Sequence, residues 1–130
     1  MQIIPQFTDL SVVALSTPSQ LKRRHASTVQ ITVKEGGGLA VNTPFSLNLY
    51  DSPTATLGGN AVLLGSMTTP NSTHLAANGG LSVFNLNFTV RAHASTGNDF
   101  LIAVVNGNQS IVESTYGNNT LASANKVSIT

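Results

Sequence analysis

Residues 84–90, FNLNFTV, are the stretch that decides the fold. Apolar and polar side chains alternate there without a break. Successive side chains of a β-strand point to opposite faces of its sheet, so this period of two predicts a half-buried strand. We assign its apolar residues to the core: Phe84, Leu86, Phe88 and Val90.

The same alternation recurs in two earlier stretches, residues 28–34 and 45–50. Their apolar side chains are expected to face the core: Val29, Ile31, Val33, Phe45, Leu47 and Leu49. Less regular stretches at 10–16, 61–67, 100–105 and 125–130 bring the total to about seven strands. In 10–16 either Val12 and Ala14 or Val13 and Leu15 would face inward. The stretch 100–105 is apolar on both faces, as in a central strand that is covered on both sides.

The segments between these strands are rich in Gly, Pro, Asn, Ser and Thr, which are turn residues. The dipeptide Asn106-Gly107 favours a tight hairpin turn. No long stretch carries a helical stripe. The pattern predicts an all-β fold, an immunoglobulin-like or fibronectin-III-like antiparallel β-sandwich, with a barrel as the structural alternative. Its bulkiest core residues are expected to be Phe45, Phe84, Phe88 and Phe100.

The composition excludes several classes of protein. Charged residues are 8% of the chain, the net charge is +1, and there is no Cys. Disulfides and thiolate metal sites are therefore excluded, and no steering toward nucleic acid or anionic membranes is expected. No apolar run approaches the roughly 18 residues of a membrane-spanning helix. Residues 1–10 lack the features of a secretion signal, so we expect residues 1–130 to be a single domain excised from a larger protein.

Residues 111–120, IVESTYGNNT, combine an acid, hydroxyls, a Tyr and two Asn. Asn tolerates left-handed φ, which suits Asn118 and Asn119 to a sharp corner. Glu113 can accept two or more backbone N–H groups, and Ile111 and Val112 can close the end of the sandwich. We therefore interpret this stretch as a loop that stabilises itself, in preference to a binding site.

This closing stretch also resembles a known family. IVESTYGNN (111–119) is similar to the closing signature of CARDB domains, the "cell adhesion related domain found in bacteria". More generic matches precede it: DLSVVALSTPS (9–19), VQITVKEGGG (29–38), FSLNLYDS (45–52) and VLLGS (62–66). The resemblance covers nearly the whole chain and implies an immunoglobulin-like or fibronectin-III-like sandwich from a cell-surface protein. It assigns an end-loop motif to Glu113, Ser114, Asn118 and Asn119.

The chain departs from the family at positions that bear on metal binding. The family often has an acid shortly before the Glu-Ser pair, where this chain has Asn106 and Asn108. It often has a second acid where Tyr116 stands. Hard cations such as calcium usually need more than one carboxylate, so we expect no metal and no cofactor.

Catalytic chemistry is not expected. The histidines His25, His74 and His93 lie in turn-like or strand-end segments, and no Gly-x-Ser-x-Gly nucleophile motif is present. With five acids in the whole chain, a glycosidase-type carboxylate pair is improbable. We predict that the domain is not an enzyme.

Two surface features remain as binding alternatives. The basic stretch LKRRH (21–25) could contact nucleic acid or an anionic polymer, but it has no interleaved aromatic residue, and we interpret it as a solvated loop. Carbohydrate sites usually use exposed aromatic side chains. Tyr116, and with lower priority Tyr50, are the candidate ligand contacts, since the chain has no Trp.

These observations predict a non-catalytic extracellular or cell-envelope module that acts as a structural spacer or as an adhesion or protein-interaction domain. The alternative is a carbohydrate-binding module appended to a secreted enzyme. The expected partners are neighbouring domains of the same polypeptide and a cell-surface protein or glycan. Neither nucleic acid nor membrane insertion is expected.

Overall fold

Two packed β-sheets make up the computed structural model, which describes residues 7–92 and 94–130. Nine strands form within these residues. They are β1 (Leu10–Ser16), β2 (Gln20–Leu21), β3 (Ala26–Glu35), β4 (Ser46–Ser52), β5 (Val62–Thr68), β6 (Gly80–Thr89), β7 (Gly97–Val105), β8 (Thr120–Ala122) and β9 (Val127–Ile129). The predicted β-sandwich is confirmed, and the barrel alternative is wrong.

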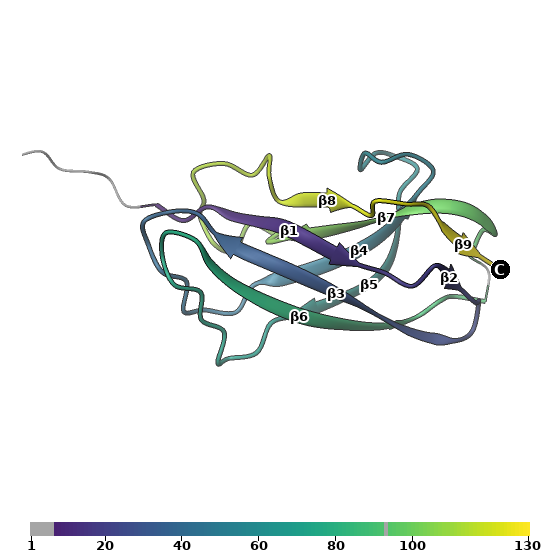
Figure 1. Ribbon diagram of the computed structural model, residues 1–130, viewed down its shortest axis with the longest axis horizontal. Helices are drawn as coiled ribbons and strands as arrows, with labels where there is room; N and C mark the ends of the chain where they lie inside the picture. Colours follow the sequence, from purple (N-terminus) through teal and green to yellow (C-terminus); the bar gives the residue numbers. More distant parts are fainter. Residues whose placement is uncertain (1–6, 93) are drawn as a thin grey trace, which may run out of the picture.

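The chain crosses between the sheets several times, although the consecutive strands β4 and β5 pair with each other. One sheet has the order β1-β3-β6, and the other has the order β2-β9-β7-β4-β5, with β8 also pairing with β7. Figure 1 shows β1, β3 and β6, the strands of the first sheet, lying across β4, β5 and β7 of the second. Every described pair is antiparallel except β2 with β9, where Leu21 pairs with Ile129. This parallel pair was not expected.

The core follows the alternation of the three most regular strands. The residues assigned to the core in β3, β4 and β6 are all buried, as are Phe45, just before β4, and Val90, just after β6. Phe45 is 1% exposed. Its ring meets that of Phe84 edge to face, with centroids 5.6 Å apart at 82°. Such aromatic pairs add to the stabilisation from apolar burial. Leu47, Leu49 and Leu86 belong to the same core cluster.

A β-bulge in β1 combines the two alternatives for residues 10–16. Val12 pairs with Val33, but Ala14 pairs with Thr32, so Val13 is an extra residue in the strand. A bulge shifts the alternation by one residue. Val12 is therefore buried before the bulge and Leu15 packs against the core after it, while Val13 is 46% exposed.

The strand β7 is covered on both faces, as its apolar sequence predicts. All its residues from Leu101 to Val105 are buried. Phe100, in contrast, is only partly buried and is not in the core cluster, so its assignment as a core residue is wrong. Its ring lies under the ammonium group of Lys126, 5.7 Å from the centroid, which is a cation–π geometry.

The predicted hairpin at Asn106-Gly107 is wrong. Asn106 does have a left-handed φ of 55°, but Gly107 does not, and no strand follows immediately. The chain instead enters a long loop, residues 106–119, before β8 begins. The short strands β2 and β8 escaped prediction because two or three residues are too few to show alternation. None of the described residues forms a helix long and apolar enough to cross a membrane.

The close approach of β5 to β6 generates a prediction. A Cβ atom added to Gly65 would lie 2.7 Å from Cβ of Phe88 and 3.1 Å from Cδ2 of Leu86. Because both neighbours belong to the packed core, Gly65→Ala should destabilise the fold by about 1–3 kcal/mol in urea unfolding. Gly58→Ala is the control, since its added Cβ meets nothing within 4 Å. Equal unfolding midpoints for the two variants would contradict the prediction.

Candidate functional site

The loop of residues 106–119 is organised around the carboxylate of Glu113, which is 8% exposed. One oxygen, Oε1, accepts a hydrogen bond from the backbone N–H of Leu10 at 2.7 Å. The other, Oε2, accepts from Nδ2 of Asn106 and from Nδ2 of Asn119, both at 2.6 Å. Two or more backbone donors were predicted for Glu113. The structure supplies one backbone donor and two side-chain amides.

The remaining residues of the predicted motif lie at the edge of this network. The backbone N–H of Ser114 donates to the carbonyl of Thr8 at 2.9 Å, while its side chain is exposed. Nδ2 of Asn118 donates to Oδ1 of Asp9 at 2.8 Å. The expected corner is present, because Asn118 lies in a turn that the N–H of Asn119 closes by donating to the carbonyl of Tyr116 at 3.3 Å. Neither Asn118 nor Asn119 has a positive φ. Asn106 takes a left-handed conformation instead, as does Gln109 three residues later.

The apolar pair that precedes Glu113 is split between two environments. Ile111 is partly buried and packs against the core cluster, as expected. Val112 is 83% exposed, so its predicted part in closing the end of the sandwich is wrong.

The two tyrosines occupy different parts of the fold. The hydroxyl of Tyr116 accepts a hydrogen bond from the backbone N–H of Glu113 at 3.2 Å and donates to the carbonyl of Ile111 at 3.4 Å. Tyr50 lies in β4, where it pairs with Ile102 of β7. Both are half-buried. The structure therefore gives the Tyr116 hydroxyl a place in the loop's own hydrogen bonds.

A second buried carboxylate, which was not predicted, lies at the same end of the sandwich. Glu35 is 0% exposed, and its Oε1 accepts hydrogen bonds from the N–H groups of Asp9 and Gly37, both at 2.8 Å. The signal was present in the alternation of β3. Glu35 continues the inward-facing series Val29, Ile31 and Val33 by one more step of two residues.

A cavity of about 400 Å³ lies elsewhere in the fold, lined by residues of β4, β5, β7 and the segment after β6. Asp51 and Asp99 both line it, together with Arg91. Asp51 continues the inward-facing series of β4 and is 5% exposed. Its burial, and secondarily the negative charge of Asp99, raises the pKa of the Asp51 carboxyl above its ordinary value.

The described residues contain no assembled metal or hydrolytic centre. Among residues 7–92 and 94–130, no three His, Asp or Glu side chains gather closely enough to hold a metal ion. His74 is exposed and its Nδ1 contacts Oδ1 of Asn42, not a Ser or an Asp. His25 is exposed at the start of β3, and His93 lies outside the described residues.

A comparison with known protein families identifies the family to which this chain belongs. The CARDB family model matches residues 7–123. The chain belongs to the CARDB family. The match spans every strand except β9, and it includes the loop around Glu113.

Solved structures agree with this assignment at the level of the fold. The CARDB domain of a Pyrococcus furiosus protein, determined in complex with di-metal ions, has a TM-score of 0.63 and 21% identity, and the match covers 100% of this chain and 95% of that one. A domain of a candidate cell surface protein from Methanosarcina acetivorans has a TM-score of 0.63 and 20% identity, with 95% and 93% covered. No curated protein matches the chain.

The same fold also occurs inside a larger enzyme chain. A β-glucosidase from Erythrobacter marinus matches with a TM-score of 0.55 and 10% identity. The match covers 95% of this chain and 16% of the β-glucosidase. At 10% identity, this match shows that the segment has the same fold and nothing more.

The Glu113 network generates a prediction about stability. Glu113→Ala leaves three donors without their acceptor, and Glu113→Gln brings an amide N–H₂ against them. Each change should cost about 1–3 kcal/mol in urea unfolding. Ser114→Ala is the matched control in the same loop, because only the backbone of Ser114 takes part in the hydrogen bonds above. A Glu113 variant as stable as the Ser114 variant would refute a stabilising role.

The buried carboxyl of Asp51 in the cavity predicts how the stability of the fold depends on pH. The folded state binds a proton on Asp51 more tightly than the unfolded state, since the pKa is raised on folding. Ionised Asp51 therefore destabilises the fold above its folded pKa, and the penalty vanishes below the unfolded value of about 4. Asp51→Asn should raise the melting temperature at pH 7, and the gain should disappear as the pH falls to about 3.

The neighbouring acid provides the control for that measurement. Asp99→Asn removes the repulsion but leaves the burial of Asp51, so it should recover only part of the gain. A gain from Asp51→Asn that is the same at pH 3 and pH 7 would show that ionisation of Asp51 is not its cause.

Proposed function

We propose that this CARDB domain is a non-catalytic module of a larger extracellular or cell-envelope protein, where it acts as a structural spacer or as an adhesion or protein-interaction domain. The observation that carries the proposal is the family match over residues 7–123. The similarity to a domain of a candidate cell surface protein supports the location. Its partners would be the neighbouring domains of the polypeptide and a surface protein or glycan.

The shape of the domain supports the role of a spacer. Figure 1 shows an elongated sandwich in which the start of β1 and the C-terminal residue Thr130 lie toward opposite ends of the long axis. The first long strand, β1, pairs with β3 in one sheet, and the last strand, β9, pairs with β7 in the other. Tension between the two ends would pull along these strands and load many ladder hydrogen bonds together.

A carbohydrate-binding module appended to a secreted enzyme is the second candidate. It is favoured by the occurrence of this fold within a β-glucosidase chain. In this role the half-buried Tyr116 and Tyr50 would be the ligand contacts, because aromatic rings bind the apolar faces of sugars. The two hydrogen bonds that hold the Tyr116 hydroxyl in the loop make the spacer or adhesion role the better supported one.

The location of the native polypeptide tests the proposal. An antibody raised against this domain should detect a band much larger than 13.5 kDa in the surface or secreted fraction of the source cells. A cytoplasmic band near 13.5 kDa would overturn the proposal. The second candidate predicts in addition a saturable change in tyrosine fluorescence on titration with neutral polysaccharides, and this change should be lost in Tyr116→Ala. The spacer or adhesion role alone predicts no such change.

A further inference from the structure

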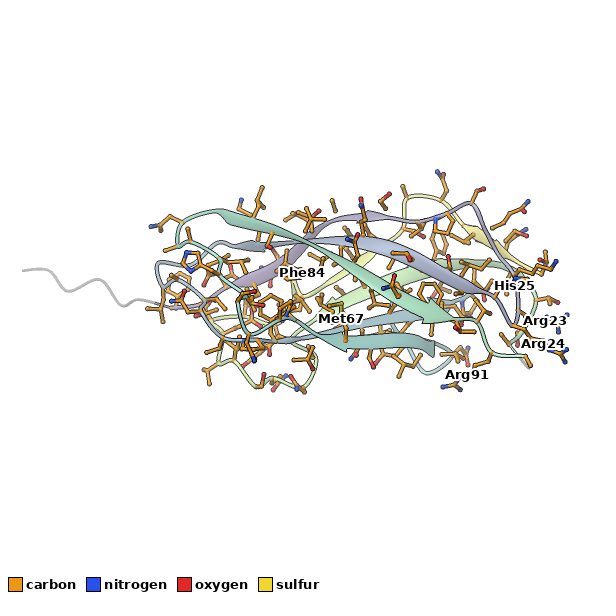
Figure 2. All side chains as sticks on the ribbon, turned by 90° about the horizontal axis from the view of Figure 1, so that it is seen from below. Arg23, Arg24, His25, Met67, Phe84 and Arg91 are labelled. Carbon is orange, nitrogen blue, oxygen red and sulfur yellow. The ribbon has the colours of Figure 1, made fainter. Side chains whose placement is uncertain are left out.

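We propose that the end of the sandwich formed by Lys22, Arg23, Arg24 and Arg91, here called the basic pole, binds an anionic polysaccharide that carries sulfate or carboxylate groups. The choice of ligand rests on the extracellular location in the proposed function. Figure 2 shows Arg23, Arg24 and Arg91 at the same end of the molecule, with His25 beside them. From sequence alone, residues 21–25 were interpreted as a solvated loop.

Residues 22–25 form a turn whose backbone is hydrogen-bonded to two other segments of the chain. The N–H of Arg23 donates to the carbonyl of Thr130 at 2.9 Å, next to the end of β9. The N–H of Arg24 donates to the carbonyl of Val90, just after β6, at 2.7 Å. The turn is closed by a third bond at 3.1 Å, from the N–H of His25 to the carbonyl of Lys22. The arginines therefore project from a backbone that the rest of the fold positions.

Arg24 occupies a conformation that its side chain does not favour. Its φ is 69°, in the left-handed region where a Cβ atom crowds the following carbonyl. Gly or Asn would adopt this conformation at lower cost. Residues held in such conformations concentrate at functional sites, so a charged side chain here is itself a reason to look for a ligand.

The cations of the basic pole are available to an external anion. The pole carries four of the six Lys and Arg residues of the chain, and all four are exposed. The hydrogen bonds recorded for Arg23 and Arg24 run through their backbone N–H groups. Lys22, Arg23 and Arg24 line an open hollow of about 360 Å³ together with Ala92 and Thr130. None of the described residues that line this hollow has an acidic side chain, although Thr130 brings the terminal carboxylate of the 130-residue chain to it. Asp51 and Asp99 line the separate cavity that Arg91 also borders.

The chemistry of the hollow favours an anionic polysaccharide over other polyanions. Guanidinium groups present paired donors that match the oxygens of sulfate and carboxylate. Proteins that bind single-stranded nucleic acid usually add aromatic side chains on which bases stack, and none of the described residues that line this hollow is aromatic. Ala92 is the only apolar side chain among the described residues that line it, so the hollow offers little surface for insertion into a lipid bilayer.

The test compares two variants that lose the same charge from different places. Arg23→Gln/Arg24→Asn removes two charges from the pole, and Asn suits the left-handed φ. Lys34→Gln/Lys126→Gln removes two charges from residues that do not line the hollow. Circular dichroism and melting temperature establish that each variant is folded. Binding of the 130-residue chain is measured against dextran sulfate, with unsulfated dextran of equal length as the neutral control.

We expect the wild type to bind dextran sulfate saturably, to bind more weakly as salt screens the charges, and not to bind dextran. The pole variant should lose about tenfold or more in affinity, and the Lys34/Lys126 variant less than about threefold. Equal losses in the two variants would overturn the proposal, because they would show attraction by net charge alone. No binding to dextran sulfate would overturn it as well.

Two further ligands test the choice of polymer. Tighter binding to a DNA oligonucleotide of matched charge, or binding confined to phosphatidylglycerol vesicles, would overturn the polysaccharide as the ligand. Failure of these binding measurements leaves the location of the chain unaffected, because cell fractionation measures that location independently. The two proposals can therefore fail separately.

Discussion

One buried carboxylate, that of Glu113, links the two sheets at the end of the sandwich where β1 begins. Its three donors come from Leu10 at the start of β1, Asn106 just after β7, and Asn119 just before β8. The first strand belongs to one sheet and the other two to the opposite sheet. Hydrogen bonds to a charged acceptor in a site of low dielectric are strong, and their loss would leave buried donors unpaired. The course of the loop of residues 106–119, which has no regular secondary structure, depends on this arrangement.

The few charges of this chain are divided between the ends of the molecule. At the Glu113 end the carboxylates of Glu35 and Glu113 are turned inward and accept hydrogen bonds from the backbone or from amides. At the opposite end the cations of the basic pole are exposed. With 8% charged residues, the position of each group matters more than the net charge of +1. A module built in this way can use one end for its own stability and present the other to an anionic ligand, which is the division of labour that we propose.

The alternation of apolar and polar residues predicted most of the core but not the buried polar residues at the strand ends. The apolar residues of β3, β4 and β6 were placed correctly because the orientation of a strand side chain follows directly from its position. Polar residues in the same phase, Glu35 and Asp51, were not recognised as buried, since a charged residue at the end of a strand usually reaches water. The Asn106-Gly107 dipeptide predicted a hairpin from local preference, yet the chain continues into the longer loop that Glu113 organises. Local preference was overridden there by contacts with distant residues.

The sequence by itself determined the all-β class, the apolar faces of the regular strands and the resemblance to CARDB domains, because each of these depends on residues close together in the chain. Only the tertiary structure decided which donors reach Glu113, because Leu10 lies 103 residues away from it. The same holds for Arg91, which meets the turn of Arg23 and Arg24 only when the end of β6 packs beside it. Sequence separation hides such contacts, since it is the packing of one sheet on the other that brings the groups together.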